Sequence, residues 1–357
     1  MSRARGRTIA AAAALAVVVA VVPAVAGAKQ DARGPRLSVV WRAPTPADGA
    51  AFTVVAGSPL TVALSARSSR VGELVLIGNR GVPAGATFAS AYSFPGSATF
   101  SWTPTAAQTG EHVISFTART HDLPHGHAVP RSILVHVRDS GPRGPHDPFP
   151  LTAPGGISRS AAVLRAIPAR VEPNATSRVL TRLRTTTPEH VRNVVLALTG
   201  RIDEQGRYWV RVRLPILPNG STGWVPRTAL GPYRTIRTRL VIDRDLFTAT
   251  LYRRGAAIFR TRVGVGKAHW PTPKGEFHVR EKLTGFSDPV YGPLAFGLNA
   301  RSAVLTDWLN GGFIGIHGTN QPQILPGRVS HGCVRMRNDA IRRLARLMPI
   351  GTPVTIH

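Results

Sequence analysis

The sequence predicts a mainly β, multidomain chain with one clear helix near the C-terminus. The 357 residues leave room for two or three domains that each bury a core of their own. Along most of the chain, apolar residues alternate with polar ones in short runs that Gly and Pro interrupt. Near the C-terminus the apolar residues instead recur three and four positions apart, which is the spacing of a helix.

The first 28 residues predict an export signal. Arg3, Arg5 and Arg7 form a basic start, residues 8–22 are almost wholly apolar, and small residues around Ala26 suit a signal peptidase. An uncleaved membrane anchor is the alternative, because this stretch approaches spanning length. We therefore expect the protein outside the cytoplasm, with a membrane partner only if the segment is retained.

The chain is strongly basic, with a formal net charge of +27. The arginines are spread along the chain and no basic stripe interleaved with aromatics is present, so nucleic acid is not the expected partner. Two interpretations stay open. One is a compositional bias towards arginine, and the other is attraction to anionic polymers of the cell wall.

Residues 35–139 predict a β-sandwich. Alternating apolar positions define several strands, and their spacing with intervening Gly and Pro is typical of that architecture: Leu60, Val62, Leu64 and Ala66; Ile114, Phe116 and Ala118; Ile133, Val135 and Val137. The run Phe100-Ser101-Trp102-Thr103-Pro104 resembles bacterial immunoglobulin-like domains. A loop with His121, Asp122, His125 and His127 could bind a metal, although a hairpin connection is the simpler interpretation. We expect no metal site.

A Pro- and Gly-rich linker, residues 140–159, separates this region from a second β domain at residues 160–233. Tyr208–Val212 and Gly223–Pro226 resemble the last strands of bacterial SH3-like domains. Such a domain could contact wall peptides or act as a spacer.

Residues 236–357 predict a third domain, in which strands precede the helix. Gly264, Gly266 and Gly275 mark tight turns or close backbone approach. In the helix, Asn338 is expected to cap the N-terminus, and Pro349 ends it. Its apolar face is predicted to contain Ile341, Leu344, Ala345 and Met348, with Arg342, Arg343 and Arg346 opposite. Residues 352–356 predict a final strand.

The lone cysteine of the chain, Cys333, follows a Ser-His-Gly sequence and has His331 and His317 upstream. A thiol is an effective nucleophile when an imidazole takes its proton and backbone N–H groups bind the resulting oxyanion. Gly332 allows a tight turn beside the sulfur, and Gly318 allows a main-chain carbonyl to approach the His317 ring and fix its tautomer. A buried structural cysteine is the alternative, but it needs no such polar neighbours.

These residues also resemble a known family. Ile316-His317-Gly318-Thr319 followed by Ser330-His331-Gly332-Cys333-Val334-Arg335-Met336 looks like the signature of the L,D-transpeptidase (YkuD-type) catalytic domain. Upstream, Leu240–Asp243 and the segment from Trp270-Pro271-Thr272-Pro273 to Phe277 resemble the same family. The resemblance covers residues 236–357.

The residues and the resemblance together imply a set of roles. Cys333 is the expected nucleophile, His317 its base, and the N–H groups of Gly332 and Cys333 the oxyanion donors. His331 has two interpretations, a second imidazole near the sulfur if its segment is extended, or a ring that holds the loop; the resemblance favours a supporting catalytic role. Substrate contacts are expected from Arg335, whose guanidinium suits a carboxylate, and from these other positions: Ser330, Gly318, Thr319 and Tyr291.

The resemblance further implies peptidoglycan stem peptides as substrates. The expected reaction forms a thioester on a tetrapeptide stem, releases D-Ala and makes a 3→3 cross-link, with no metal or organic cofactor. Two alternatives remain: a carboxypeptidase or cross-link hydrolase that uses the same thiol, and a non-catalytic wall-binding protein.

Overall fold

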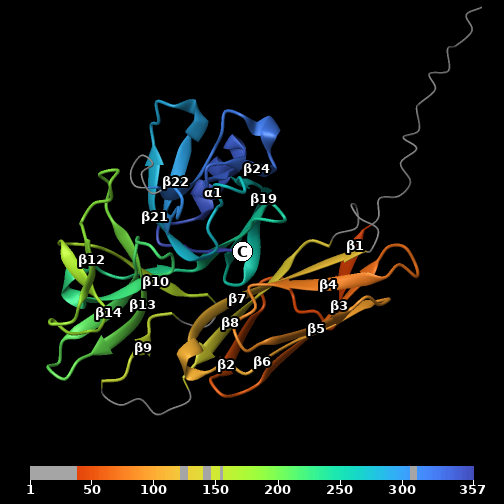
Figure 1. Ribbon diagram of the computed structural model, residues 1–357, viewed down its shortest axis with the longest axis horizontal. Helices are drawn as coiled ribbons and strands as arrows, with labels where there is room; N and C mark the ends of the chain where they lie inside the picture. The colour runs from red at the N-terminus through yellow and green to blue at the C-terminus, as the bar shows by residue number, and fades with distance from the viewer. Residues whose placement is uncertain (1–37, 121–127, 140–145, 153–155, 306–311) are drawn as a thin grey trace, which may run out of the picture. The chain divides into compact units, whose positions relative to one another are not determined.

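The computed structural model describes residues 38–120, 128–139, 146–152, 156–305 and 312–357 (Figure 1). Both the expected export segment, residues 1–28, and the histidine-containing loop at 121–127 lie outside these ranges. Within them, strands dominate and the one α-helix is α1 (Asn338–Leu347), close to the C-terminus. The prediction of a mainly β chain with one helix near its end is therefore confirmed.

The first region consists of two four-stranded sheets that share a core. Their strands, in sheet order, are β1 (Val39–Arg42), β3 (Leu60–Ser68), β6 (Gly96–Trp102) and β5 (Thr87–Ala91), and then β2 (Ala51–Val55), β8 (Arg131–Arg138), β7 (Gly110–Thr120) and β4 (Val75–Arg80). Apolar side chains from both sheets, such as Phe100 and Phe116, form one buried cluster. The alternating residues predicted for these strands are buried, except Leu60, which is partly buried and packs against the cluster.

The second region is one sheet of eight strands. In order these are β12 (Val179–Leu183), β11 (Ile167–Arg170), β15 (Thr222–Pro226), β14 (Tyr208–Arg213), β13 (Val194–Ile202), β10 (Ser158–Ala162) and β16 (Arg234–Ile236), with β9 (Phe149–Pro150) paired to β13. Its own core contains Val210, Val212 and Val225. The predicted strands around Tyr208 and Gly223 are β14 and β15, which pair antiparallel.

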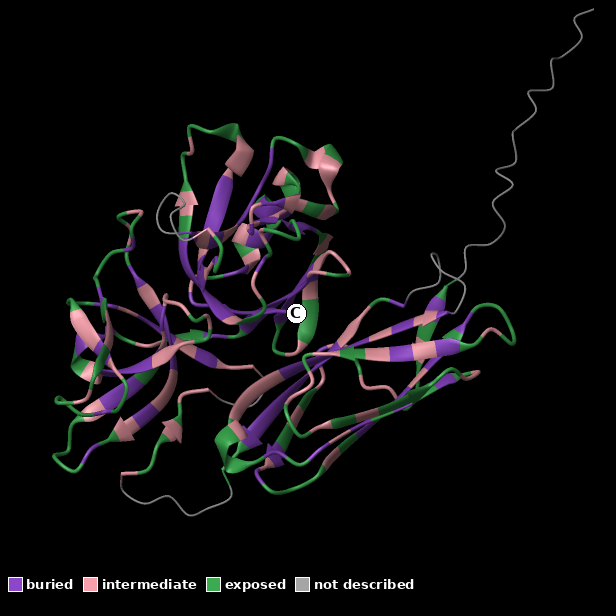
Figure 2. Cartoon of the chain, viewed as in Figure 1, coloured by how far each residue is buried: buried purple, intermediate pink, exposed green. Residues whose placement is uncertain are grey.

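The third region is a ten-stranded mixed sheet. Its order is β19 (Ala256–Arg262), β18 (Thr248–Arg253), β17 (Thr238–Asp243), β26 (Pro353–Ile356), β21 (Gly275–Thr284), β22 (Leu294–Arg301), β23 (Phe313–His317), β25 (Val334–Arg335), β20 (Gly264–Gly266) and β24 (Gly327–Ser330). The final strand, β26, lies between β17 and β21 and is buried throughout (Figure 2). Residues from the end of the chain thus hold the middle of this sheet together.

The helix α1 packs on this sheet through its predicted apolar face. Ile341 and Leu344 are fully buried, whereas Arg342, Arg343 and Arg346 are exposed. The strands and α1 share one hydrophobic cluster that also contains Ile316, Val334 and Met336. The apolar residues next to His317 and Cys333 therefore anchor both in the core.

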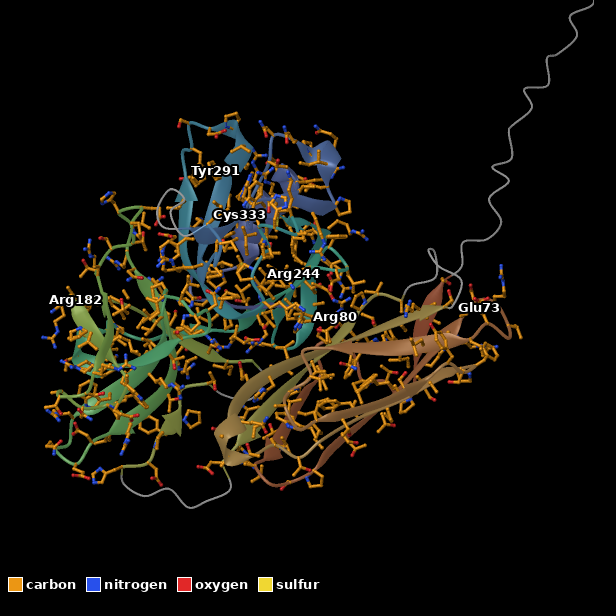
Figure 3. All side chains as sticks on the ribbon, viewed as in Figure 1. Glu73, Arg80, Arg182, Arg244, Tyr291 and Cys333 are labelled. Atoms are coloured by element: carbon orange, nitrogen blue, oxygen red, sulfur yellow. The ribbon has the colours of Figure 1, made fainter. Side chains whose placement is uncertain are left out.

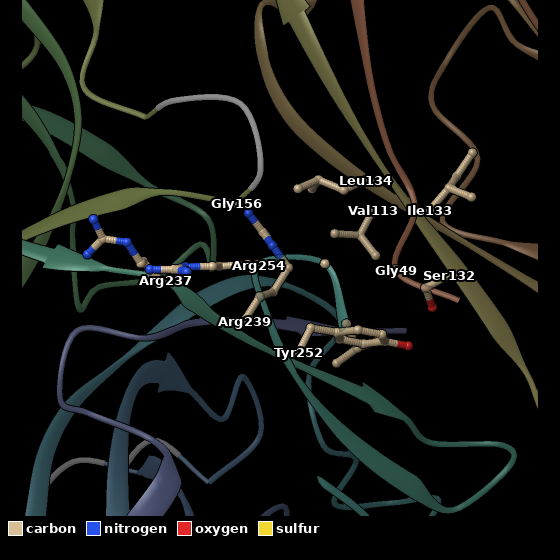
Figure 4. Close-up of a pocket in the computed structure, with 12 residues that line it drawn as sticks. Gly49, Val113, Ser132, Ile133, Leu134, Gly156, Arg237, Arg239, Tyr252 and Arg254 are labelled. Carbon is tan, nitrogen blue, oxygen red and sulfur yellow. The ribbon is translucent and has the colours of Figure 1, made fainter. Parts of the chain in front are cut away.

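Four buried side chains join β7 and β8 of the first region to β17 and β18 of the third: Val113, Leu134, Val241 and Tyr252. Figure 4 shows residues that line a cavity here, among them Val113, Leu134 and Tyr252. The cavity there has a volume of about 30 Å³, room for no more than about two water molecules. This seam is a packing contact and not a ligand pocket.

Candidate active site

Two neighbouring parallel strands bring His317 and Cys333 together. His317 is the last residue of β23, and Cys333 directly precedes β25. The strands pair in register, with Ile316 opposite Val334 and His317 opposite Arg335. The sulfur lies over β23, where the Gly315 N–H donates to Sγ at 3.4 Å. Residues sixteen positions apart in sequence are thus neighbours through backbone pairing.

His317 is buried, with 2% of its surface exposed. Its Nδ1 lies 2.7 Å from the carbonyl oxygen of Gly318. A carbonyl can only accept, so Nδ1 carries the proton and Nε2 is the basic nitrogen. Burial lowers the pKa of His317 to about 4, with Arg335 acting in the same direction and the Gly318 hydrogen bond opposing it. The imidazole is consequently neutral at pH 7 and able to take a proton.

The loop after His317 is held by a close approach to α1. A Cβ added to Gly318 would lie 2.3 Å from Asn338 Oδ1 and 2.8 Å from Pro293. The same Oδ1 accepts from the Thr319 N–H at 2.9 Å. The expected capping role of Asn338 is wrong, because Arg337 is the N-cap and Asn338 is the first helical residue. Its side chain binds the His317 loop instead.

Cys333 is half-buried, and burial raises the pKa of its thiol. The Gly315 N–H and the nearby charge of Arg335 oppose this increase. With a neutral imidazole and a protonated thiol, the site rests as an uncharged pair and not as a thiolate–imidazolium pair. A nucleophilic reaction at this sulfur would therefore require the thiol to lose its proton.

The Ser330 side chain fixes the turn before Cys333 through two hydrogen bonds. Its hydroxyl donates to the Cys333 carbonyl at 2.6 Å and accepts from the Gly332 N–H at 3.1 Å. Ser330, an expected substrate contact, has no exposed surface, and its hydroxyl bonds within the turn. The Gly332 N–H, an expected oxyanion donor, is thus bonded within the turn. The Cys333 N–H makes no backbone hydrogen bond to another described residue.

The segment around His331 is turned and not extended. Gly332 has a φ of +117°, in the region that favours glycine. The His331 ring lies 4.0 Å from that of Trp270, centroid to centroid. The extended conformation on which the second-imidazole interpretation depended is therefore not present. The contact with Trp270 fits the interpretation of His331 as a ring that holds the loop.

Of the expected substrate contacts, Tyr291 and Arg335 adjoin the reacting pair. The Tyr291 ring packs edge-on to His317 at 5.2 Å (Figure 3 labels Tyr291 and Cys333). Arg335 is half-buried, and its Nε has no hydrogen-bond partner among the described residues. Thr319 is only 1% exposed and its hydroxyl accepts from the Gln321 N–H at 3.0 Å. Thr319, like Gly318, shapes the loop and does not present a side chain to substrate.

Three contributors were not identified from the sequence: Trp270, which packs on His331; Asn338, which binds the His317 loop; and Thr272, whose hydroxyl contacts Gly332. For Thr272 a signal existed, the Trp-Pro-Thr-Pro segment, but the sequence does not say what its hydroxyl contacts. In the described part of the chain, no group of three His, Cys, Asp or Glu residues could hold a metal ion. None of the described helices is long and apolar enough to cross a bilayer.

Known proteins match the third region. A family model for the L,D-transpeptidase catalytic domain (YkuD) matches residues 237–356. L,D-transpeptidase YkuD of Bacillus licheniformis is 32% identical over 122 residues, which are 34% of this chain and 67% of that protein. The YkuD protein of Bacillus subtilis is 32% identical over 126 residues, 35% of this chain and 69% of that protein.

Solved structures of L,D-transpeptidases are also similar. One from Enterococcus faecium, a C442S mutant, is 22% identical with a TM-score of 0.27; the match covers 34% of this chain and half of that one. One from Mycobacterium smegmatis is 15% identical with a TM-score of 0.26, covering 89% of this chain and 99% of that one. The family model and the two Bacillus proteins establish that the chain belongs to the YkuD family of L,D-transpeptidases.

Proposed function

We propose that the protein is a peptidoglycan L,D-transpeptidase that forms 3→3 cross-links through a thioester on Cys333. The observation that carries the proposal is the neutral His317, whose Nδ1 is bonded to Gly318, on the strand adjacent to the sulfur. Acyl transfer by cysteine needs a thiol and a nearby base. Here the base is an imidazole whose other nitrogen is held by a hydrogen bond, and the thiol lies over the strand that carries it.

In the first half-reaction, His317 Nε2 takes the thiol proton as Sγ attacks the carbonyl carbon of the diamino acid, which is bonded to the nitrogen of the terminal D-Ala in a tetrapeptide stem. The Cys333 N–H is the donor for the resulting oxyanion, since the Gly332 N–H is bonded to Ser330. The tetrahedral intermediate collapses with cleavage of the C–N bond. D-Ala leaves with the proton that His317 held, and the S–C bond remains as a thioester.

In the second half-reaction, the amine of a neighbouring stem attacks the thioester. His317 accepts a proton from that amine, the new C–N bond forms, and the sulfur leaves and regains its proton. Water in place of the amine would give a carboxypeptidase or hydrolase with the same residues. A binding protein without activity is disfavoured, because it needs no base fixed beside a thiol.

Arg335 is the proposed anchor for a stem carboxylate. Its charge contributes to the lowered pKa of His317 and opposes the increase that burial causes in the pKa of Cys333, and its Nε has no partner among the described residues. A guanidinium suits a carboxylate through paired N–H donors. Tyr291, which packs on the His317 ring, is proposed to line the binding site of the donor peptide.

The compartment and the other two regions belong to this proposal. We place the protein at the cell wall after export through residues 1–28, with the 35–139 sandwich and the 160–233 domain as spacers or wall contacts. Fractionation of cells that express the full chain tests this placement. Abundant cytoplasmic protein that retains residue 1 would contradict it.

Product analysis tests the chemistry. The full chain is incubated with a disaccharide tetrapeptide, with and without an added acceptor stem, and the products are resolved by mass spectrometry. We expect release of D-Ala and a cross-linked dimer from the wild type, neither from C333A, and unchanged products from H146Q, a histidine substitution outside the site. A hydrolysed stem without a dimer would assign the protein to the hydrolases, and activity of C333A would refute the thiol mechanism.

A further inference from the structure

Thr272 makes two side-chain hydrogen bonds that connect the turn before Cys333 to the 267–274 loop. Its hydroxyl accepts from the Gly266 N–H at 2.9 Å and donates to the Gly332 carbonyl oxygen at 2.7 Å. The roles are unambiguous, because an N–H can only donate and a carbonyl can only accept. With 1% of its surface exposed, Thr272 lies inside the loop and cannot touch substrate.

The Gly332 carbonyl and the Cys333 N–H belong to one peptide unit. A trans peptide is planar, and its C=O and N–H point in opposite directions. By holding the carbonyl towards the 267–274 loop, Thr272 turns the Cys333 N–H away from that loop. This is the N–H that makes no backbone hydrogen bond to another described residue, whereas the Gly332 N–H is bonded to Ser330.

The peptide needs such a restraint because of Gly332. Its φ of +117° lies in the region open to glycine. Because glycine has no Cβ, it also restricts the ψ angle that orients the following peptide less than other residues do. A side chain at this position would not help, since a Cβ would approach the Ile314 side chain to 2.9 Å. Glycine permits the turn, and the Thr272 hydroxyl selects one orientation of the peptide that follows it.

Thr272 is itself held firmly. A Cβ on Gly266 would lie 2.1 Å from the Trp270 carbonyl oxygen and 2.5 Å from the Thr272 nitrogen, so the loop packs directly on β20. The Arg244 guanidinium donates to the Thr272 carbonyl through Nη1 and to the His357 carbonyl at 2.9 Å through Nε. Thr272 is thereby fixed to both β20 and the end of β26.

We propose that Thr272 is a positioning residue that fixes the Gly332–Cys333 peptide so that the Cys333 N–H stabilises the oxyanion of acyl transfer. This rests on the proposed function of Cys333 and extends it to a residue that touches neither substrate nor sulfur. Removing an oxyanion donor typically lowers the rate about 10²- to 10³-fold. If the donor N–H points away from the oxyanion in only part of the molecules, the rate should fall about 10- to 100-fold.

The test compares two reactions of the same thiol. A carbapenem acylates it through a tetrahedral oxyanion, whereas iodoacetamide alkylates it by displacement without one. We expect T272V to acylate about 10- to 100-fold more slowly and to alkylate within about threefold of the wild type. T272S, which keeps the hydroxyl, should acylate nearly as fast as the wild type. T355V is the matched control, because Thr355 is a buried threonine of the same sheet whose hydroxyl has no partner among the described residues.

Equal acylation by T272V and the wild type would overturn the proposal. A parallel loss of acylation and alkylation would also overturn it, since that result indicates a collapsed loop and not a misdirected N–H. Failure of the proposed function gives a different result, namely acyl transfer by C333A.

Discussion

The lowered pKa of His317 leads to a specific prediction for activity at acid pH. An ordinary imidazole titrates near 6.5, but burial lowers the pKa of His317 to about 4. The acylation rate should therefore stay level from pH 8 to about 5 and fall below that, with a midpoint near 4. The measurement is the single-turnover acylation rate by a carbapenem against pH at constant ionic strength.

The same shift has a consequence for stability. Between pH 6.5 and 4 the unfolded chain binds a proton at His317 that the folded chain does not, so stability falls as the pH falls through this range. The pKa difference, from 6.5 to about 4, corresponds to about 3 kcal/mol. This contribution is fully present above pH 6.5 and largely lost at pH 4.

Urea denaturation of the full chain at several pH values measures this effect, with H317Q as the comparison. His278 is also buried with a pKa lowered to about 3, but it is present in both proteins, so the difference between them isolates His317. We expect the wild type to lose about 3 kcal/mol more than H317Q between pH 6.5 and 4. An acid midpoint of activity near 6.5, together with equal pH dependence of stability, would refute the neutral buried imidazole.

Three further predictions concern the loops around the reacting pair. G318A places a Cβ 2.3 Å from Asn338 Oδ1 and should lower the free energy of unfolding, measured by urea titration, by about 1–3 kcal/mol. G327A is the control: its added Cβ has its nearest contact at 3.4 Å and should change the free energy of unfolding little. S330A removes the two hydrogen bonds that Ser330 makes within the turn and should lower the free energy of unfolding by about 1–3 kcal/mol in the same titration. Unchanged stability would contradict a role of Ser330 in fixing the turn. H331A should lower the acylation rate by less than about tenfold, whereas H317A should lower it by about 10²- to 10⁴-fold, and H331A should keep the acid midpoint of the rate. If H331A alone loses that midpoint, the two histidines have the opposite roles.

The sequence predicts features whose cause is local. Alternation identifies the buried face of β3 and β7, and helical spacing identifies the buried face of α1. The carbonyl contact to His317 is also local, since its acceptor is the next residue, Gly318. In these cases neighbouring residues contain the whole physical reason.

Features that depend on distant partners were not predicted. Asn338 is a good capping residue in isolation, but its side chain meets Thr319, nineteen positions away, once α1 packs beside the loop. Thr272 bonds to Gly332 across sixty positions. The extended conformation expected near His331 fails because Gly332 turns the chain, and glycine alone does not specify which of its conformations is used.

The central claim is that Cys333 forms the acyl-enzyme, and intact-mass analysis tests it most directly. The full chain is mixed with a tetrapeptide stem without acceptor, quenched in acid within the first turnover, and digested to locate the added mass. We predict one adduct per chain, equal to the stem minus D-Ala, on the peptide that contains Cys333, and none on C333A. Release of D-Ala by a wild-type protein whose Cys333 remains unmodified, or an adduct on C333A, would contradict the account.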